Sequence, residues 1–225
     1  MIVSLKVDID KQMVFRYLGY KKTSKIPLKI EKSVEMALCD AAKYLEPKVV
    51  YDEVACEWDT GGRTLRFSRG FYLSGAYIYK HLKNCQSLIA AISTLGNDFD
   101  EKIIEIMQKE GAIKAMIYDA IGSAALMNSN RQFWLFLVEE LKKRSCGITR
   151  QLCPGDNDWP LTEQRVIFKM LDANSIGVSL NDSYVMNPLK SLSMVYGINK
   201  DGQVDRQDHD CRECNLIGCI FRQVD

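Results

Sequence analysis

The sequence lacks the features that mark several common classes of protein. Its 225 residues include 30 Lys and Arg against 29 Asp and Glu, a formal net charge of +1, so there is no excess of basic residues for nucleic acid or an anionic membrane. The longest charge-free run, Asn84 to Asn97, has 14 residues, whereas a bilayer span needs roughly 20. We therefore expect neither a nucleic-acid nor a membrane partner. Because MIVSLKVDIDK at the start carries acids where a signal peptide has an apolar run, we expect a cytoplasmic protein.

Conventional catalytic patterns are also missing. The chain has no GxSxG, Walker, HExxH or GxGxxG motif. Its two histidines, His81 and His209, are far apart in the sequence, which argues against a histidine-based mechanism. We expect His81 to be a solvated or core-edge residue.

The pattern of apolar residues predicts an α+β fold: a single domain with a mixed or antiparallel sheet and flanking helices over 1–200, followed by a short Cys-rich tail over 201–225. Strands are expected at 49–56, 64–67, 87–95, 148–150, 176–180 and 192–198, the first two joined as a hairpin through Gly61 and Gly62. Helices are expected at 31–46 (stopped by Pro47), 73–82, 98–109, 112–144 (broken near Gly122 or at 128–130) and 161–172 (capped by Thr162).

Eight cysteines fall into two groups. We expect Cys39, Cys56, Cys85 and Cys146, each among apolar neighbours, to be small buried hydrophobic residues. Cys211, Cys214 and Cys219 form a C-x2-C-x4-C pattern, which predicts zinc or an iron–sulfur cluster, with Cys153 or His209 as the fourth ligand. The alternative is a set of free thiols at a frayed terminus.

One ordered series of motifs carries a family resemblance. It comprises Arg16 to Tyr20, Thr94 to Gly96, Asp119 to Ser123, Arg150 to Leu161, Gln164, Phe168 to Leu171, Gly177 to Leu180 and Met186 to Ser193. The series resembles the S-adenosylmethionine-binding activation domain of cobalamin-dependent methionine synthase, and especially small standalone proteins that look like that domain. Without this resemblance, the loop before Leu161 would read as a Pro/Gly turn with Trp159 as a core anchor.

The resemblance implies a ligand-binding role for Arg150, Cys153, Pro154, Gly155, Tyr196 and Gly197. The arginine is implied to hold the carboxylate of the methionine moiety, and the glycine to let the backbone approach the ligand. The ring of Tyr196 is a further candidate, for contact with the sulfonium cation. Two residues depart from the family pattern: Cys153 replaces serine or alanine, and Asp156 replaces the tyrosine of Pro-Gly-Tyr. A sulfur partner in the tail makes Cys153 the preferred fourth metal ligand. Lys190, Ser191 and Ser193 are expected to be a solvated lysine and plain strand residues, although Lys190 is also a candidate for contact with a corrin carboxylate or a partner protein.

The function that the resemblance implies is reactivation of a corrinoid-dependent methyltransferase, in its simplest form a split methionine synthase whose cobalamin is supplied by the partner. A flavodoxin-like or ferredoxin-like reductant is implied with it. Such a chain positions S-adenosylmethionine and is a component of a methyltransferase rather than a complete enzyme. The alternative is a metal or iron–sulfur module that docks on a corrinoid or redox partner without S-adenosylmethionine. A third reading is a structural remnant that binds no ligand.

Overall fold

The computed structural model describes residues 1–21, 23–59, 61, 64–68, 70–205 and 218–219. Its strands are β1 (Ile2–Ser4), β2 (Lys48–Trp58), β3 (Thr64–Phe67), β4 (Tyr72–Ser74), β5 (Ser87–Thr94), β6 (Gly147–Ile148), β7 (Ser179–Leu180), β8 (Met186–Asn187) and β9 (Ser191–Asn199). Its α-helices are α1 (Lys11–Tyr17), α2 (Leu28–Ala41), α3 (Ala76–Leu82), α4 (Asn97–Lys109), α5 (Ala112–Lys142) and α6 (Gln164–Met170). Two 3-10 turns, η1 (Leu161–Glu163) and η2 (Ala173–Ile176), flank α6.

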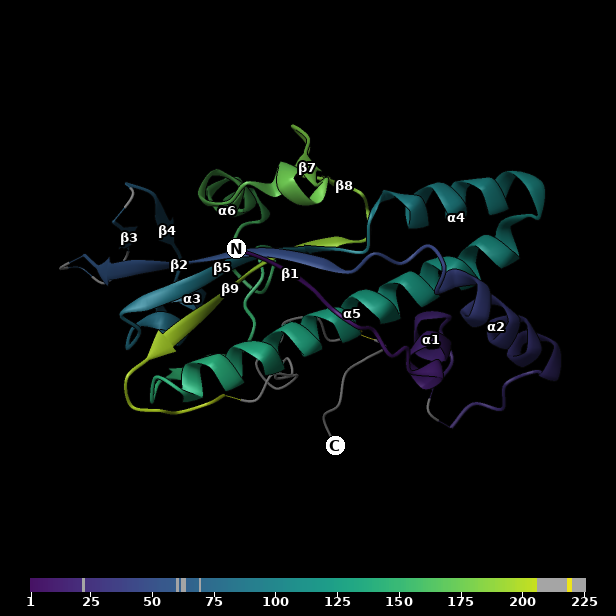
Figure 1. Cartoon of the computed structure of the whole chain (residues 1–225), viewed down its shortest axis with the longest axis horizontal. Coiled ribbons are helices and arrows are strands. Elements are labelled where there is room, and N and C mark those ends of the chain that lie inside the picture. Colours follow the sequence, from purple (N-terminus) through teal and green to yellow (C-terminus); the bar gives the residue numbers. More distant parts are fainter. Residues whose placement is uncertain (22, 60, 62–63, 69, 206–217, 220–225) are drawn as a thin grey trace.

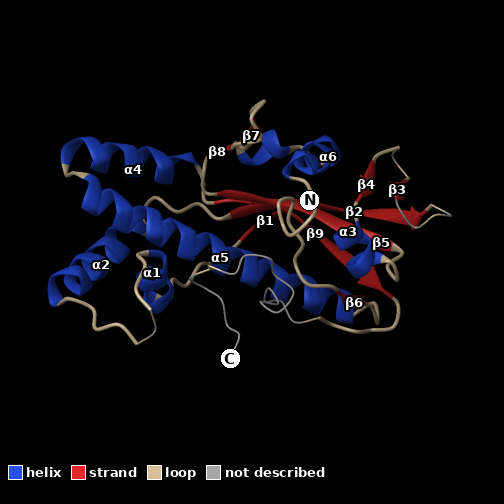
Figure 2. Ribbon diagram, turned by 180° about the vertical axis from the view of Figure 1, so that it is seen from behind, coloured by secondary structure: helices blue, strands red, loops and turns tan. Residues whose placement is uncertain are grey.

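Seven strands form one curled antiparallel sheet in the order β4-β3-β2-β5-β9-β6, with β1 also paired to β2, and β7 and β8 form a separate hairpin. The helix α5 runs along one face of the sheet, and α6 covers the other (Figures 1 and 2). The predicted α+β class and the antiparallel alternative for the sheet are confirmed.

Alternation along the central strands divides the core between the two faces. Ile89 and Tyr196 lie opposite each other in the register and face α5, whereas Leu88, Ile92 and Val195 belong to the cluster under α3 and α6. Because β5 is covered on both faces, nearly all of its side chains are buried, which explains why its sequence carries no charged residue. The predicted strand over 87–95 is confirmed.

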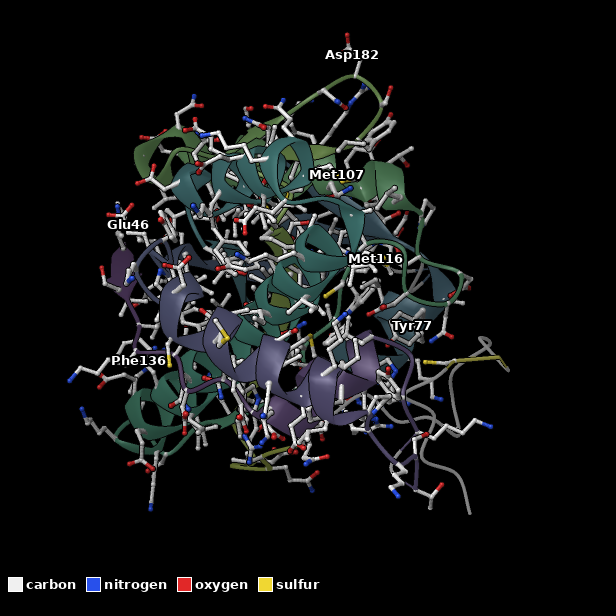
Figure 3. All side chains as sticks on the ribbon, turned by 90° about the vertical axis from the view of Figure 1, so that its right-hand side faces the viewer. Glu46, Tyr77, Met107, Met116, Phe136 and Asp182 are labelled. Carbon is white, nitrogen blue, oxygen red and sulfur yellow. The ribbon has the colours of Figure 1, made fainter. Side chains whose placement is uncertain are left out.

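A third core lies outside the sheet, where α1, α2 and α4 pack on the N-terminal half of α5. Figure 3 views this helical cluster from its free end, with Met107 of α4 and Met116 of α5 at the surface. The 31 residues of α5 link this cluster to the sheet as one unbroken helix, so the predicted break near Gly122 or at 128–130 is wrong. Ser129 and Asn130 are buried, and burial along the whole helix outweighs the low helix propensity of these residues.

Several other boundaries differ from the predictions. The helix expected from residue 31 begins at Leu28, directly after Pro27, and ends at Ala41 before Pro47 is reached. The first part of the expected helix 73–82 is strand β4, because Gly75 at φ +136° separates it from α3. Thr162 does not cap a helix, since Pro160 leads into η1 before α6 begins. Of the expected strand 176–180, only Ser179 and Leu180 form a strand, β7, because Ile176 ends η2 and Gly177 turns the chain at φ +73°.

The hairpin of β2 and β3 and the long strand β9 are confirmed. Of the four isolated cysteines, Cys85 is buried as predicted, Cys56 and Cys146 are partly buried, and Cys39 is exposed, so the prediction for Cys39 is wrong. Within the described ranges, no helix is both long and apolar enough to cross a membrane.

Candidate functional site

The segment from Thr149 to Pro160, called the strap below, continues the edge of the sheet alongside the last residues of β9. The backbone N–H of Thr149 donates to the carbonyl of Gly197 (2.9 Å), and its hydroxyl accepts from the N–H of Gly197 (2.8 Å). Leu152 and Val195 exchange two backbone hydrogen bonds of 3.1 and 2.9 Å. The strap is therefore held to β9 by paired backbone groups.

The tip of the strap is a tight turn over Cys153 to Trp159. The N–H of Gly155, at φ +99°, donates to the carbonyl of Trp159 (2.8 Å), and a side-chain Cβ is disfavoured at this φ. The Oδ2 of Asp156 accepts from the N–H of Cys153 (2.9 Å), while the N–H of Asp156 donates to the carbonyl of Cys153 (2.9 Å). Where the family pattern has tyrosine, this chain has an acid that closes its own turn. Trp159 is 1% exposed and anchors the strap in the core, as the alternative interpretation of the loop as a Pro/Gly turn expects.

Tyr196 lies beneath the strap with its ring wholly buried. Its hydroxyl is within hydrogen-bond distance of the Gln151 Oε1 (3.2 Å) and the Met194 Sδ (3.1 Å), and its ring packs edge-on to Phe133 at 6.0 Å between centroids. The Nε2 of Gln151 donates to the Sγ of Cys153 (3.2 Å). The strap and β9 are thus joined through a thiol, an amide and a phenol. Burial raises the pKa of both Cys153 and Tyr196.

Gly197 is required by close packing. A Cβ built there would lie 2.4 Å from the Sγ of Cys85 and 2.6 Å from Cδ2 of Leu82. Its small size lets the end of β9 approach α3 while its backbone bonds Thr149.

Arg150 is half-buried on the outer edge of the strap. Its backbone N–H donates to the Oδ2 of Asp205 (3.2 Å). Asp205 stands there because residues 203–205 run beside β6, where the N–H of Ile148 donates to the carbonyl of Gln203 (3.0 Å) and the N–H of Asp205 donates to the carbonyl of Ile148 (2.9 Å). The structure thus brings Arg150, Cys153 to Gly155, Tyr196 and Gly197 to one edge, with Asp205, which the motifs did not mark. The sequence offered one signal for Asp205, an acidic residue shortly after the strand predicted at 192–198.

The Asp119 to Ser123 motif and the segment around Lys190 meet at the opposite end of β9. Lys190 is not a solvated lysine, because its side chain is 12% exposed and its Nζ lies 2.6 Å from the Oδ1 of Asp119 and 3.0 Å from the Oγ of Ser123. A Cβ on Gly122 would lie 3.0 Å from Cε of Lys190 and 2.4 Å from Phe99. The glycine of the Asp119 to Ser123 motif therefore makes room for this lysine.

Asp100 completes this second group. Its Oδ2 accepts from the backbone N–H of Leu189, and its Oδ1 is buried with no hydrogen-bond partner in the described part of the chain. Burial raises the pKa of Asp100, although Lys190 opposes the shift. Ser191 and Ser193 are strand residues as predicted, and their hydroxyls bond Thr94 (2.9 Å) and Gln164 (3.2 Å).

The cysteine tail falls largely outside the described residues. Cys211, Cys214 and His209 belong to the part that is not described, so the metal or cluster predicted on Cys211, Cys214 and Cys219 stays a prediction. Among residues 1–205 and 218–219, with the gaps given above, no three His, Cys, Asp or Glu side chains group to hold a metal ion. The preference for Cys153 as fourth ligand also remains a prediction, and burial of this thiol disfavours the thiolate that a metal needs.

Two surface cavities, of about 430 and 490 Å³, lie around α6 and β7 and around β1 and β2, away from the strap.

The sheet, the two helical layers and the strap define an α+β fold of the reactivation-domain class. Among solved structures, the chain is similar to one described as the MetH reactivation domain bound to AdoHcy, with a TM-score of 0.64 and 15% sequence identity, over 90% of this chain and 79% of that chain. The fold predicted from the motifs is therefore confirmed. No family model and no curated protein matches the chain.

Proposed function

We propose that the chain binds S-adenosylmethionine at the strap and acts as the reactivation subunit of a corrinoid-dependent methyltransferase, most simply a split methionine synthase. The observation that carries the proposal is the meeting of Arg150 and the Pro154-Gly155 turn at one edge of β9, in a fold shared with a domain described as bound to AdoHcy. The corrinoid belongs to the partner chain, and bound S-adenosylmethionine supplies a methyl group.

The residues at the strap fit the ligand in different ways. Arg150 offers a planar guanidinium for the carboxylate of the methionine moiety. Gly155 is exposed, so a ligand can approach its backbone, although its N–H already donates to Trp159. Tyr196 fits less directly, because its ring is enclosed by Phe133, Met194 and Gln151 and supports the strap from below. Because Asp156 closes the turn where the family pattern has tyrosine, we expect the ligand to be held by the Arg150 side chain and by the backbone of the turn.

Calorimetric titration with AdoHcy and S-adenosylmethionine tests the proposal. A ligand held by one ion pair and backbone contacts should bind in the micromolar to millimolar range, about −8 to −4 kcal/mol. Arg150→Ala should weaken binding by about 1.5 to 3 kcal/mol, the usual worth of a charged hydrogen bond. Arg165→Ala, which removes an exposed arginine stacked on Tyr184, is the matched control and should change nothing. Absence of saturable heat at millimolar ligand would contradict the proposal.

The partner is tested separately. The chain has no Asp-x-His-x-x-Gly signature for cobalamin, so the purified protein should contain no corrin. Mixed with a cobalamin-binding partner chain, S-adenosylmethionine and a low-potential reductant, it should restore methylation. Corrin that co-purifies tightly with this chain alone would contradict the split-subunit arrangement.

A further inference from the structure

We propose that Asp205 binds the α-ammonium group of the methionine moiety while Arg150 holds its carboxylate, so that Arg150 of the strap and Asp205 together form a clamp for an amino-acid zwitterion. This inference rests on the proposed function and adds a residue outside the family motifs. It predicts that the site distinguishes ligands with an amino-acid head from ligands with the nucleoside part alone.

The position of Asp205 is fixed by the edge of the sheet. After β9, Gly202 at φ +74° reverses the chain, and the carbonyl of Gln203 accepts from both the N–H of Ile148 (3.0 Å) and the Nδ2 of Asn199 (2.9 Å). A Cβ on Gly147 would lie 1.9 Å from that carbonyl oxygen, so Gly147 is needed for this approach. Residues 203–205 therefore extend the edge that carries the strap.

The hydrogen-bonding capacity of the Asp205 side chain suits a cation. A carboxylate accepts at about four lone-pair sites. Its Oδ2 accepts one bond from the Arg150 N–H, and its Oδ1 makes no hydrogen bond within the described part of the structure. This single bond aligns the acid with the residue expected to take the ligand's carboxylate, and a partly buried edge strengthens charge pairing relative to bulk water.

Opposite charges at neighbouring positions match an amino acid at neutral pH. Its carboxylate and ammonium groups sit on one carbon atom, so an arginine and an aspartate joined at one backbone position can face both. Asp205 and Asp201 also lie close enough to act on Cys85, the thiol that packs against Gly197. Burial, with these two acids, raises the pKa of Cys85 to about 12.

The test uses two ligands that differ in the amino-acid head. AdoHcy carries it, and 5′-methylthioadenosine lacks it. Asp205→Asn keeps an acceptor for the Arg150 N–H but removes the charge. It should lower the affinity for AdoHcy by about 5- to 50-fold and leave the affinity for methylthioadenosine within twofold of wild type. Asp201→Asn is the matched control, because it removes the same charge from the same turn, where Asp201 accepts from the N–H of Gln203 (3.0 Å). It should leave both ligands within twofold.

The outcomes separate this inference from the proposed function. If wild type binds AdoHcy and Asp205→Asn binds it equally or more tightly, the clamp is wrong while the proposed function stands. An equal loss for both ligands also overturns the clamp, since the role of Asp205 is then structural. If wild type does not bind AdoHcy at all, the proposed function fails and the clamp fails with it.

Discussion

The two ends of β9 use similar side chains for different purposes. At its start, Lys190 is largely enclosed against α5 and paired with Asp119, so a charged pair there joins a helix to the sheet. At its end, Arg150 and Asp205 meet on an outer edge, joined through a backbone N–H. Roughly 25 Å of strand separates the two groups. A basic residue in a motif can therefore stabilise the fold, as Lys190 does, or be available to bind a ligand, as proposed for Arg150. Only its surroundings in the structure distinguish the two roles.

The largest effect is expected from adding a methyl group at the end of β9, with the same change at its start as the comparison. Gly197→Ala places a Cβ against Cys85 and Leu82 and should destabilise the fold by about 2 to 3 kcal/mol. It should also lower the affinity for AdoHcy, because Gly197 holds the strap through its hydrogen bonds to Thr149. Gly122→Ala meets Phe99 and Lys190, but alanine gains about 1 kcal/mol over glycine in a helix, so the net cost should be about 1 to 2 kcal/mol. Chemical denaturation and titration measure both quantities.

The two variants should differ in binding. Gly122→Ala should leave the affinity for AdoHcy within twofold, because its contacts lie at the start of β9. An equal loss of affinity in both variants would show that the two ends are coupled through the strand.

The next effect concerns the buried lysine. Lys190→Met keeps the length of the side chain but removes its bonds to Asp119 and Ser123, and it leaves the partly buried Asp100 without a nearby cation. We expect a loss of about 2 kcal/mol in the free energy of unfolding. Lys169→Met, on the exposed face of α6, is the control and should lie within about 0.5 kcal/mol of wild type. A Lys190→Met variant with the same free energy of unfolding as wild type would show that the ionic group adds no stability.

A smaller effect is expected at the tip of the strap. Asp156→Ala removes the acceptor for the Cys153 N–H and should cost about 1 to 2 kcal/mol, with faster amide hydrogen exchange across 153–159. Asp156→Asn keeps an acceptor and should lose less. Asp158→Ala, at an exposed position two residues on, is the matched control. Unchanged exchange in Asp156→Ala would show that the turn holds without its acid.

Much of the fold could be predicted from local pattern. The sequence displays these elements directly: alternation marks β2 and β3, an uncharged run marks β5, an apolar run marks β9, and helical periodicity marks α4 and α5. The continuity of α5 could not be predicted, because it depends on two separate cores that bury its polar residues. Boundaries at Gly75 and Pro160 depended on backbone dihedrals that a propensity argument does not fix.

The motifs marked most of the residues that make up the candidate site. Motif order marked Arg150 to Gly155, Tyr196 and Gly197, and these residues lie at one edge because the strap pairs with β9. The motifs did not show that Lys190 is buried, since Gly122 and Asp119 come from a helix far earlier in the sequence. The motifs did not mark Asp205, the residue that the clamp proposal adds, for a similar reason: its place depends on the return of the chain beside β6, which no local pattern encodes.

The smallest expected effect is a change in the pH dependence of stability at the start of β9. Burial raises the pKa of Asp100 in the folded state, so the folded chain holds its proton more tightly than the unfolded chain. Its contribution is then fully present below the unfolded pKa of about 3.9 and is lost as pH rises through the higher folded value. An asparagine at this position does not titrate, so the stability of Asp100→Asn relative to wild type should increase from about pH 4 to pH 7. Glu53→Gln should show the opposite slope, because the hydrogen bonds from Arg144 lower the pKa of Glu53, whose contribution is present at neutral pH and lost on acidification. Urea midpoints measured across this pH range give both slopes. Equal slopes would mean that Asp100 is solvated in the folded chain, and that the start of β9 is as open to water as the edge at its end.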